Sequence, residues 1–103
     1  MSKKIYDEDI NMLVPWFLMA SYAYYRLGIS IMKDSEFDRI SRNLKENWEE
    51  VEHMHKHLIT LEMLSTSSGY SIKYTNMIKY ATLSYIDSLT VRQYNKFQTH
   101  ANK

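Results

Sequence analysis

The sequence predicts a small all-α protein: a single three-helix domain with a helix–loop–helix corner and room for one short extended segment near residues 70–74. Three observations support this prediction. The chain has 103 residues, a length that suits one domain. It contains only two glycines and one proline, too few for a turn-rich sheet. Apolar residues also recur at helical spacing in three separate segments.

The first helix is expected at about residues 7–27. Its first turn is acidic, which suits the positive end of the helix dipole, and contains Asp7, Glu8 and Asp9. Pro15 should kink this helix or split it into a short and a longer piece. An apolar stripe then follows at helical spacing, formed by Trp16, Ala20, Tyr24 and Leu27. Gly28 is expected to end the helix, because glycine accepts the left-handed conformation of a C-cap.

The second helix should follow a loop at residues 28–33 and occupy about residues 35–55. Asp34 is the expected N-cap, since its carboxylate can accept backbone N–H groups that otherwise lack partners. The pattern is strongly amphipathic. One face contains Phe37, Ile40, Leu44, Trp48 and Val51, and the other contains mostly Arg39, Arg42, Lys45, Glu46 and Glu49.

The C-terminal half gives weaker signals. Residues 65–70 have loop composition, and residues 70–74 suit a short extended segment. A third helix is expected at about residues 75–89, with an apolar face of Met77, Ile78, Ala81, Tyr85 and Leu89. Residues 90–103 form a basic C-terminal tail, because no acidic residue follows Asp87.

The charge balance argues against a nucleic-acid-binding protein. The net charge is +1, so only the basic tail, with Arg92, Lys96 and Lys103, offers weak contact to a phosphate backbone or an acidic partner. The alternative for this tail is a solvated, frayed terminus. The sequence does not define the oligomeric state or the role of residues 58–103.

Cellular location is predicted from what the sequence lacks. There are no cysteines, which excludes disulfides and thiolate chemistry. The start, MSKKIYDEDINM, lacks the features of a signal peptide. The longest apolar run, MLVPWFLMA, is far shorter than the roughly 20 residues that span a bilayer. We therefore expect no membrane association and a cytoplasmic location, in the host cytoplasm if a phage encodes the chain.

Three histidines occur close together at His53, His55 and His57. If the second helix continues that far, His53 and His57 lie one turn apart on one face, a spacing that allows a metal ion to bridge them. No third ligand is evident, so no metal is expected, and the alternative is an exposed cluster that titrates near neutral pH. The sequence also lacks a glycine-rich phosphate loop and a nucleotidyl-transfer lysine motif.

The segment YYRLGISIMKDSEFD, residues 24–38, has the most distinctive chemistry. Asp34, Phe37 and Asp38 are spaced i, i+3, i+4 and share one helix face. Tyr24 and Tyr25 end the preceding helix, and a short loop between antiparallel helices brings these ends together. The expected product is a cup with aromatic walls and two carboxylates. Such a cup suits a ribose and a flat, positively charged ring such as nicotinamide.

These residues resemble the N-terminal helical domain (domain Ia) of bacterial NAD+-dependent DNA ligases. That family has a Tyr-His pair at the end of one helix and, ten residues after the tyrosine, Asp-x-x-Tyr-Asp at the start of the next. Here Tyr24 matches the first tyrosine, Asp34 lies ten residues later, and Phe37 and Asp38 match the last two positions. The resemblance covers about residues 16–57 as a helical hairpin. It includes DRISRNLKENWEEVEHMH, which is similar to the family's next helix.

The resemblance implies recognition of nicotinamide mononucleotide (NMN) or NAD+. The implied ligand-binding residues are Tyr24, Tyr25, Asp34, Phe37 and Asp38. Two departures weaken hydrogen bonding while keeping the aromatic rings: Tyr25 replaces the family's histidine, and Phe37 replaces a tyrosine. The alternative is that these residues serve only the fold, as cap, first-turn charges and core. The catalytic part of a ligase is absent, so the chain is not expected to be an enzyme.

Three hypotheses for function follow. The first is a non-catalytic module that binds a nicotinamide nucleotide. The second is a phage-type accessory or inhibitor protein that contacts a host ligase or an NAD-using defence enzyme, and an exposed aromatic and methionine patch would favour it. The third is a weak NAD-glycohydrolase that uses Asp34 or Asp38 near the ribose, although a shallow cup excludes little water.

Overall fold

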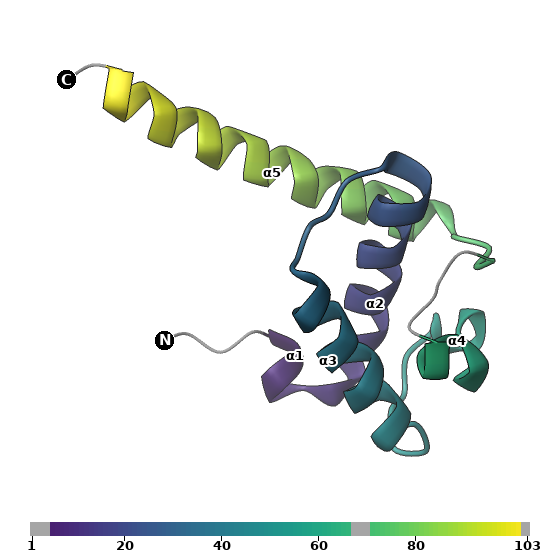
Figure 1. Cartoon of the computed structure of the whole chain (residues 1–103). Coiled ribbons are helices and arrows are strands. Elements are labelled where there is room, and N and C mark those ends of the chain that lie inside the picture. Colours follow the sequence, from purple (N-terminus) through teal and green to yellow (C-terminus); the bar gives the residue numbers. More distant parts are fainter. Residues whose placement is uncertain (1–4, 67–70, 102–103) are drawn as a thin grey trace.

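The computed structural model describes the backbone of residues 5–66 and 71–101 and the side chains of residues 6, 8–66 and 71–89. All regular elements in this part are helical, and no strand occurs in it, so the all-α prediction is confirmed (Figure 1). In chain order the elements are α1 (Ile5–Glu8), η1 (Ile10–Met12), α2 (Leu13–Tyr22), η2 (Ala23–Leu27), α3 (Asp34–Glu46), η3 (Lys56–Leu58), α4 (Leu61–Thr66) and α5 (Asn76–Ala101).

The N-terminal helix is divided, but not at Pro15. The chain leaves α1 at Asp9, whose backbone is extended (φ −138°, ψ 108°) and whose carboxylate accepts the Asn11 N–H at 3.0 Å. Pro15 instead lies in the first turn of α2, where a missing N–H costs little because these groups lack intrahelical partners. The prediction that this helix is divided is therefore correct, but the division is at Asp9 and not at Pro15.

The end of this helix confirms the predicted glycine cap. After α2 the helix widens into the π-helical turn η2, and Gly28 follows with φ 68° in the left-handed region. The N–H groups of Gly28 and Ile29 both donate to the Ala23 carbonyl. A π turn contains more residues than an α turn, so the predicted stripe loses its register: Ala20 is buried, whereas Tyr24 is 57% exposed.

α3 begins at Asp34 as expected, but Asp34 is not its N-cap. Lys33 occupies that position without a side-chain capping bond, and its carbonyl accepts the N–H groups of Glu36 and Phe37. Asp34 is instead the first helical residue, where its charge still suits the helix dipole.

The expected length of α3 is also wrong, because the helix ends at Glu46 rather than near residue 55. Asn47 leaves helical geometry (φ −109°, ψ 19°), and its side-chain amide donates to the Asn43 carbonyl. The Lys56 ammonium then donates to the carbonyls of Trp48 and Val51 and lies 4.7 Å from the centre of the Trp48 ring. This lysine stabilises a compact turn where amphipathic periodicity predicts more helix.

Two elements after this turn differ from the prediction. The short helix α4 was not expected, and its Leu64 is buried. Residues 71–74 are irregular rather than a strand, although Ile72 is buried as the apolar pattern suggests; residue 70 lies outside the described part. α5 starts near the expected position but continues to Ala101, so the backbone of the predicted tail up to that residue is helical.

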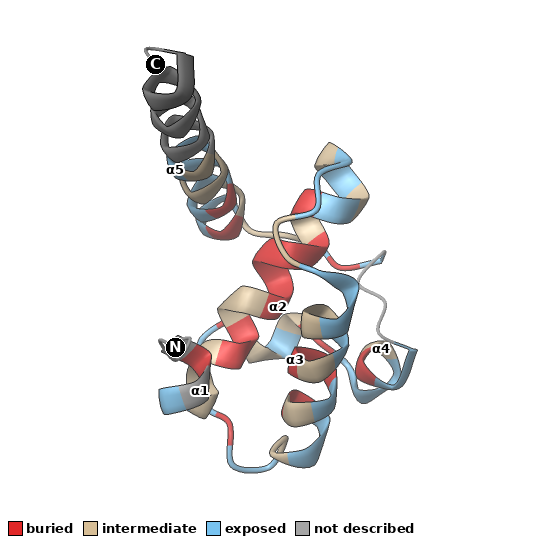
Figure 2. Ribbon diagram, turned by 60° about the vertical axis from the view of Figure 1, so that its left-hand side comes forward, coloured by how far each residue is buried: buried red, intermediate tan, exposed pale blue. Residues whose placement is uncertain are grey.

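The core is centred on α2, which contacts both α3 and α5, while α4 packs against α3 (Figures 1 and 2). α2 is buried on nearly every side, as expected for a central helix. The predicted apolar face of α5 is confirmed in part: Ile78 is buried and Tyr85 packs against the core. Met77 and Ala81 are exposed instead, and Thr82 is buried. The largest fully buried side chains are Phe17, Leu13, Leu18, Ile40, Leu44, Ile72, Val14 and Val51.

Candidate functional site

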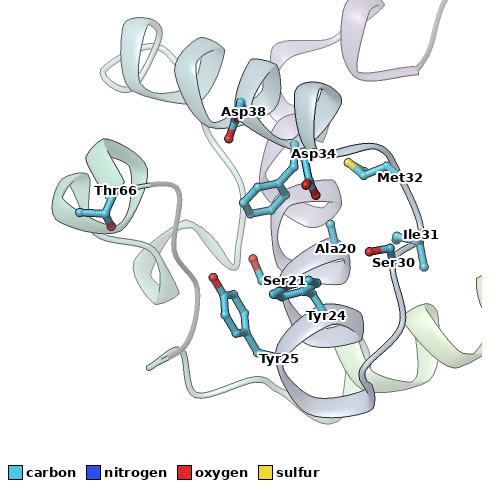
Figure 3. A pocket seen from close by; sticks show the side chains of 11 residues that line it. Ala20, Ser21, Tyr24, Tyr25, Ser30, Ile31, Met32, Asp34, Asp38 and Thr66 are labelled. Atoms are coloured by element: carbon cyan, nitrogen blue, oxygen red, sulfur yellow. The ribbon is translucent and has the colours of Figure 1, made fainter.

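The corner between η2 and α3 forms a pocket of about 340 Å³. The loop at residues 28–33 reverses the chain, so that the last turn of the first helix faces the first turns of α3 (Figure 3). All five residues predicted to bind a ligand line this pocket. The complete lining is Ala20, Ser21, Tyr24, Tyr25, Ser30, Ile31, Met32, Asp34, Phe37, Asp38 and Thr66.

The aromatic rings of the pocket differ in how much of their surface is free to contact a ligand. Tyr24 and Tyr25 contact each other edge to face, with ring centres 4.9 Å apart and an interplanar angle of 88°. Phe37 is stacked on the core residue Phe17, with ring centres 5.1 Å apart and an angle of 19°. One face of Phe37 is therefore occupied by the core. The exposed ring of Tyr24 is the better platform for a flat ligand.

The two carboxylates come from successive turns of α3. Asp34 and Asp38 are both exposed, and within the described part of the chain neither forms an ion pair or accepts a side-chain hydrogen bond. No lysine, arginine or histidine is among the lining residues. The pocket therefore presents uncompensated negative charge beside aromatic rings, a combination that attracts cationic and hydroxyl-bearing groups.

Ser21 is a lining residue that the sequence argument missed. It is fully buried in α2, and its Oγ has no hydrogen-bond partner within the described structure. Figure 3 shows its hydroxyl on the side of the pocket that faces Tyr25. A signal was available, because a serine interrupts an otherwise apolar helix three residues before Tyr24. Buried hydroxyls normally have a partner, so an unpaired one in a pocket wall is unusual.

Behind the pocket, Tyr74 packs edge to face on Tyr22, with ring centres 5.2 Å apart. The Arg26 guanidinium lies 5.6 Å from the Tyr74 ring centre and donates to the Ile72 carbonyl at 3.3 Å. Burial raises the pKa of Tyr74 to about 12, while the Ser21 hydroxyl and the Arg26 charge act in the opposite direction. The Ser21 hydroxyl is therefore close enough to Tyr74 to affect its pKa, but the two groups do not form a hydrogen bond of acceptable geometry. Ser21 Oγ has no hydrogen-bond partner within the described structure.

Thr66 closes the side of the pocket opposite the tyrosines. It ends α4, and its hydroxyl donates to the Glu62 carbonyl at 3.1 Å and lies 3.3 Å from the Met63 carbonyl. Figure 3 shows Thr66 across the pocket from Ser21. Sequence reasoning missed this wall because it predicted a loop there.

The histidines do not lie along one helix. His53 precedes η3 in a loop, and its Nδ1 accepts the His55 backbone N–H at 3.1 Å. Burial, together with the nearby His55, lowers the pKa of His53. His55 is buried, and its Nε2 lies 3.2 Å from the Thr75 hydroxyl at the start of α5. α3 ends at Glu46, so the condition for a bridge, His53 and His57 one turn apart on a continuing helix, is not met.

Two further kinds of feature are absent from the described residues. No group of three or more metal-ligating side chains gathers there. No helix in that part combines the length and apolar character needed to cross a membrane. The side chains of Arg92, Lys96 and Lys103, which carry the predicted basic tail, lie outside the described residues.

Comparison with known proteins adds no identification. A scan against protein-family models and searches of curated proteins and of solved structures each found no match. The resemblance of about residues 16–57 to ligase domain Ia therefore stays a prediction from the sequence.

Proposed function

We propose that the pocket at the η2–α3 corner binds the nicotinamide–ribose half of NMN or NAD+, and that the protein is a binding module rather than an enzyme. One observation supports this proposal above others. Five residues chosen from the sequence for this ligand, at the ends of two different helices, line a single pocket of about 340 Å³. That volume lies within the range typical of small-molecule sites.

Each kind of side chain has a role in this proposal. The exposed ring of Tyr24 stacks on the flat nicotinamide, and Tyr25 supports it from the side. Asp34 and Asp38 accept hydrogen bonds from the ribose hydroxyls and attract the positive ring. Phe37, held by Phe17, supplies a fixed apolar surface.

Binding is favoured over catalysis by the surroundings of the carboxylates. Asp34 and Asp38 are exposed to water. Stabilising an oxocarbenium-like transition state of NAD+ cleavage requires charges held in a site that excludes water. An open corner between two helices suits reversible binding better. Nicotinamide release from NAD+ on prolonged incubation with the purified chain would contradict this assignment.

Calorimetric titration with NMN and NAD+ tests the proposal. We expect weak but saturable binding by the unaltered protein and loss of most of the heat in Asp38→Ala. Asp87→Ala is the matched control, because Asp87 is an exposed aspartate of α5 that does not line the pocket. Absence of heat with both compounds at millimolar concentration would refute nicotinamide binding, as would equal loss in the two variants.

A second candidate function is supported by a different surface. Met77, Tyr80 and Leu83 are exposed at 57%, 70% and 46% near the start of α5, opposite its buried face. Such a patch is typical of protein contacts. It suits the phage-type accessory or inhibitor protein, with a bacterial NAD+-dependent ligase as the partner. Binding to purified ligase that Tyr80→Ala weakens and Glu62→Ala, at an exposed position of α4, leaves intact would favour this candidate.

A further inference from the structure

The charge of the pocket restricts the ligand more narrowly than the sequence does. Its eleven lining residues include two carboxylates and no basic side chain. Phosphate groups in proteins are usually held by arginine, lysine or free N–H groups at a helix N-terminus. α3 does begin at this pocket, but its first turn places the Asp34 carboxylate in the lining, and this charge opposes an anion there. The corner therefore lacks the means to hold a phosphate.

A second, independent feature points to a ligand. The buried Ser21 hydroxyl lies in the pocket wall without a partner. A buried polar group without a partner costs free energy, and a ligand that supplies the missing hydrogen bond recovers part of that cost. Because the hydroxyl is covered in the unliganded chain, this contact requires a side chain of the pocket wall to move outward, a common change on binding. An anionic partner is disfavoured, since a further negative group would face Asp34 and Asp38.

We infer that the preferred ligand is a phosphate-free pyridinium nucleoside, such as nicotinamide riboside, and that Ser21 binds its carboxamide. The inference rests on the proposed function and makes it more specific. The ribosylated ring has one positive charge and no negative one. NMN adds a phosphate with a charge of about −1.5 to −2, which the carboxylates repel. The carboxamide is neutral and can both donate to and accept from the Ser21 hydroxyl.

The size of the charge effect can be stated as a ratio of affinities. For a phosphate about 7 Å from the two carboxylates in water, Coulomb repulsion screened at about 0.1 M ionic strength corresponds to roughly a fivefold loss of affinity, and at about 0.01 M to roughly a ten- to twentyfold loss. Nicotinamide riboside should therefore bind roughly ten- to twentyfold more tightly than NMN at low ionic strength, and about fivefold more tightly at about 0.1 M. The ratio should shrink as salt is added, because these carboxylates are exposed.

The test compares three compounds by calorimetry at low salt: nicotinamide riboside, NMN and pyridinium riboside, which lacks the carboxamide. Ser21→Ala should weaken binding of nicotinamide riboside about three- to tenfold, the usual effect of one hydrogen bond, and leave pyridinium riboside unchanged. Ser41→Ala is the matched control. Ser41 is equally buried, but it donates to the Phe37 carbonyl at 3.0 Å and does not line the pocket.

The outcomes separate this inference from the proposed function. NMN binding as tightly as the riboside, or more tightly, would overturn the phosphate-free ligand and leave nicotinamide binding standing. Equal loss for nicotinamide riboside and pyridinium riboside in Ser21→Ala would give Ser21 a purely structural role and overturn its assignment. No binding of any of the three would remove the proposed function itself, and the inference with it.

Discussion

Alkaline pH should destabilise this protein through Tyr74, the residue packed behind the pocket. Burial raises the pKa of Tyr74 from 10.0 to about 12 in the folded chain. The unfolded chain releases this proton near pH 10, whereas the folded chain retains it until higher pH. Stability is therefore fully present below about pH 10 and declines as pH rises from about 10 to 12.

The magnitude follows from the size of the shift. A shift of two pKa units corresponds to about 2.7 kcal/mol, and we discount this to about 1 kcal/mol because Tyr74 is only half-buried and water screens its charge. The Tyr74→Phe variant has no hydroxyl to ionise. It should lose about 1 kcal/mol less than the unaltered protein over this pH interval.

Urea unfolding followed by tryptophan fluorescence, at several pH values between about 8 and 11.5, measures this difference. Tyr80→Phe is the matched control, because it also removes a tyrosine hydroxyl and the Tyr80 side chain is 70% exposed. The difference between the variants isolates the contribution of the Tyr74 hydroxyl. Equal pH dependence in Tyr74→Phe and the unaltered protein would refute this account of Tyr74.

Three further predictions concern the core, the corner and the ligand. Gly28→Ala should lower the free energy of unfolding by about 1–2 kcal/mol in urea unfolding; nothing lies within 4 Å of the added Cβ, so the cost is strain at φ 68°. Leu44→Ala should cost about 2–5 kcal/mol, whereas Leu83→Ala, at an exposed position, should cost far less. Reduced nicotinamide riboside, whose ring is neutral, should bind several-fold more weakly than the oxidised form by calorimetry.

The sequence predicts the corner well because its signals are local. Gly28 ends one helix through a left-handed cap, and Asp34 begins the next one six residues later. The five predicted pocket residues lie on either side of this short loop. These residues come together if the two helices are antiparallel. The short loop between the helices is enough to produce this arrangement, whatever the rest of the fold.

The elements that were missed depend on contacts between distant residues. α3 ends at Glu46 although its apolar pattern continues, because Lys56 donates to carbonyls of the turn that follows. Trp48 and Val51 still face the core, but from this turn instead of from a helix. α4 has only six residues, too short for a periodic pattern to distinguish it from a loop.

In the pocket, too, the residues with local sequence signals were predicted, and those that depend on distant contacts were missed. Ser21 was missed because what distinguishes it is a buried hydroxyl without a hydrogen-bond partner. The packing of the fold determines this property, and the residue type does not reveal it. Thr66 was missed because it belongs to α4. The sequence therefore predicts a two-sided cup, whereas the structure has a third wall and a polar group in the side formed by α2.

Asp34 and Asp38 should respond differently to neutralisation, and this difference separates a structural role from a ligand-binding one. Asp34 is the first residue of α3, where a negative charge stabilises the helix by about 0.3–1 kcal/mol. Asp38 lies beyond the first turn, where this effect has largely declined. Asp34→Asn should therefore lower the stability of the unliganded protein, whereas Asp38→Asn should leave it nearly unchanged.

If both carboxylates attract the ligand, both variants should weaken binding of nicotinamide riboside by a similar factor. Loss of stability in Asp34→Asn without loss of affinity in either variant would mean that these residues serve α3 alone.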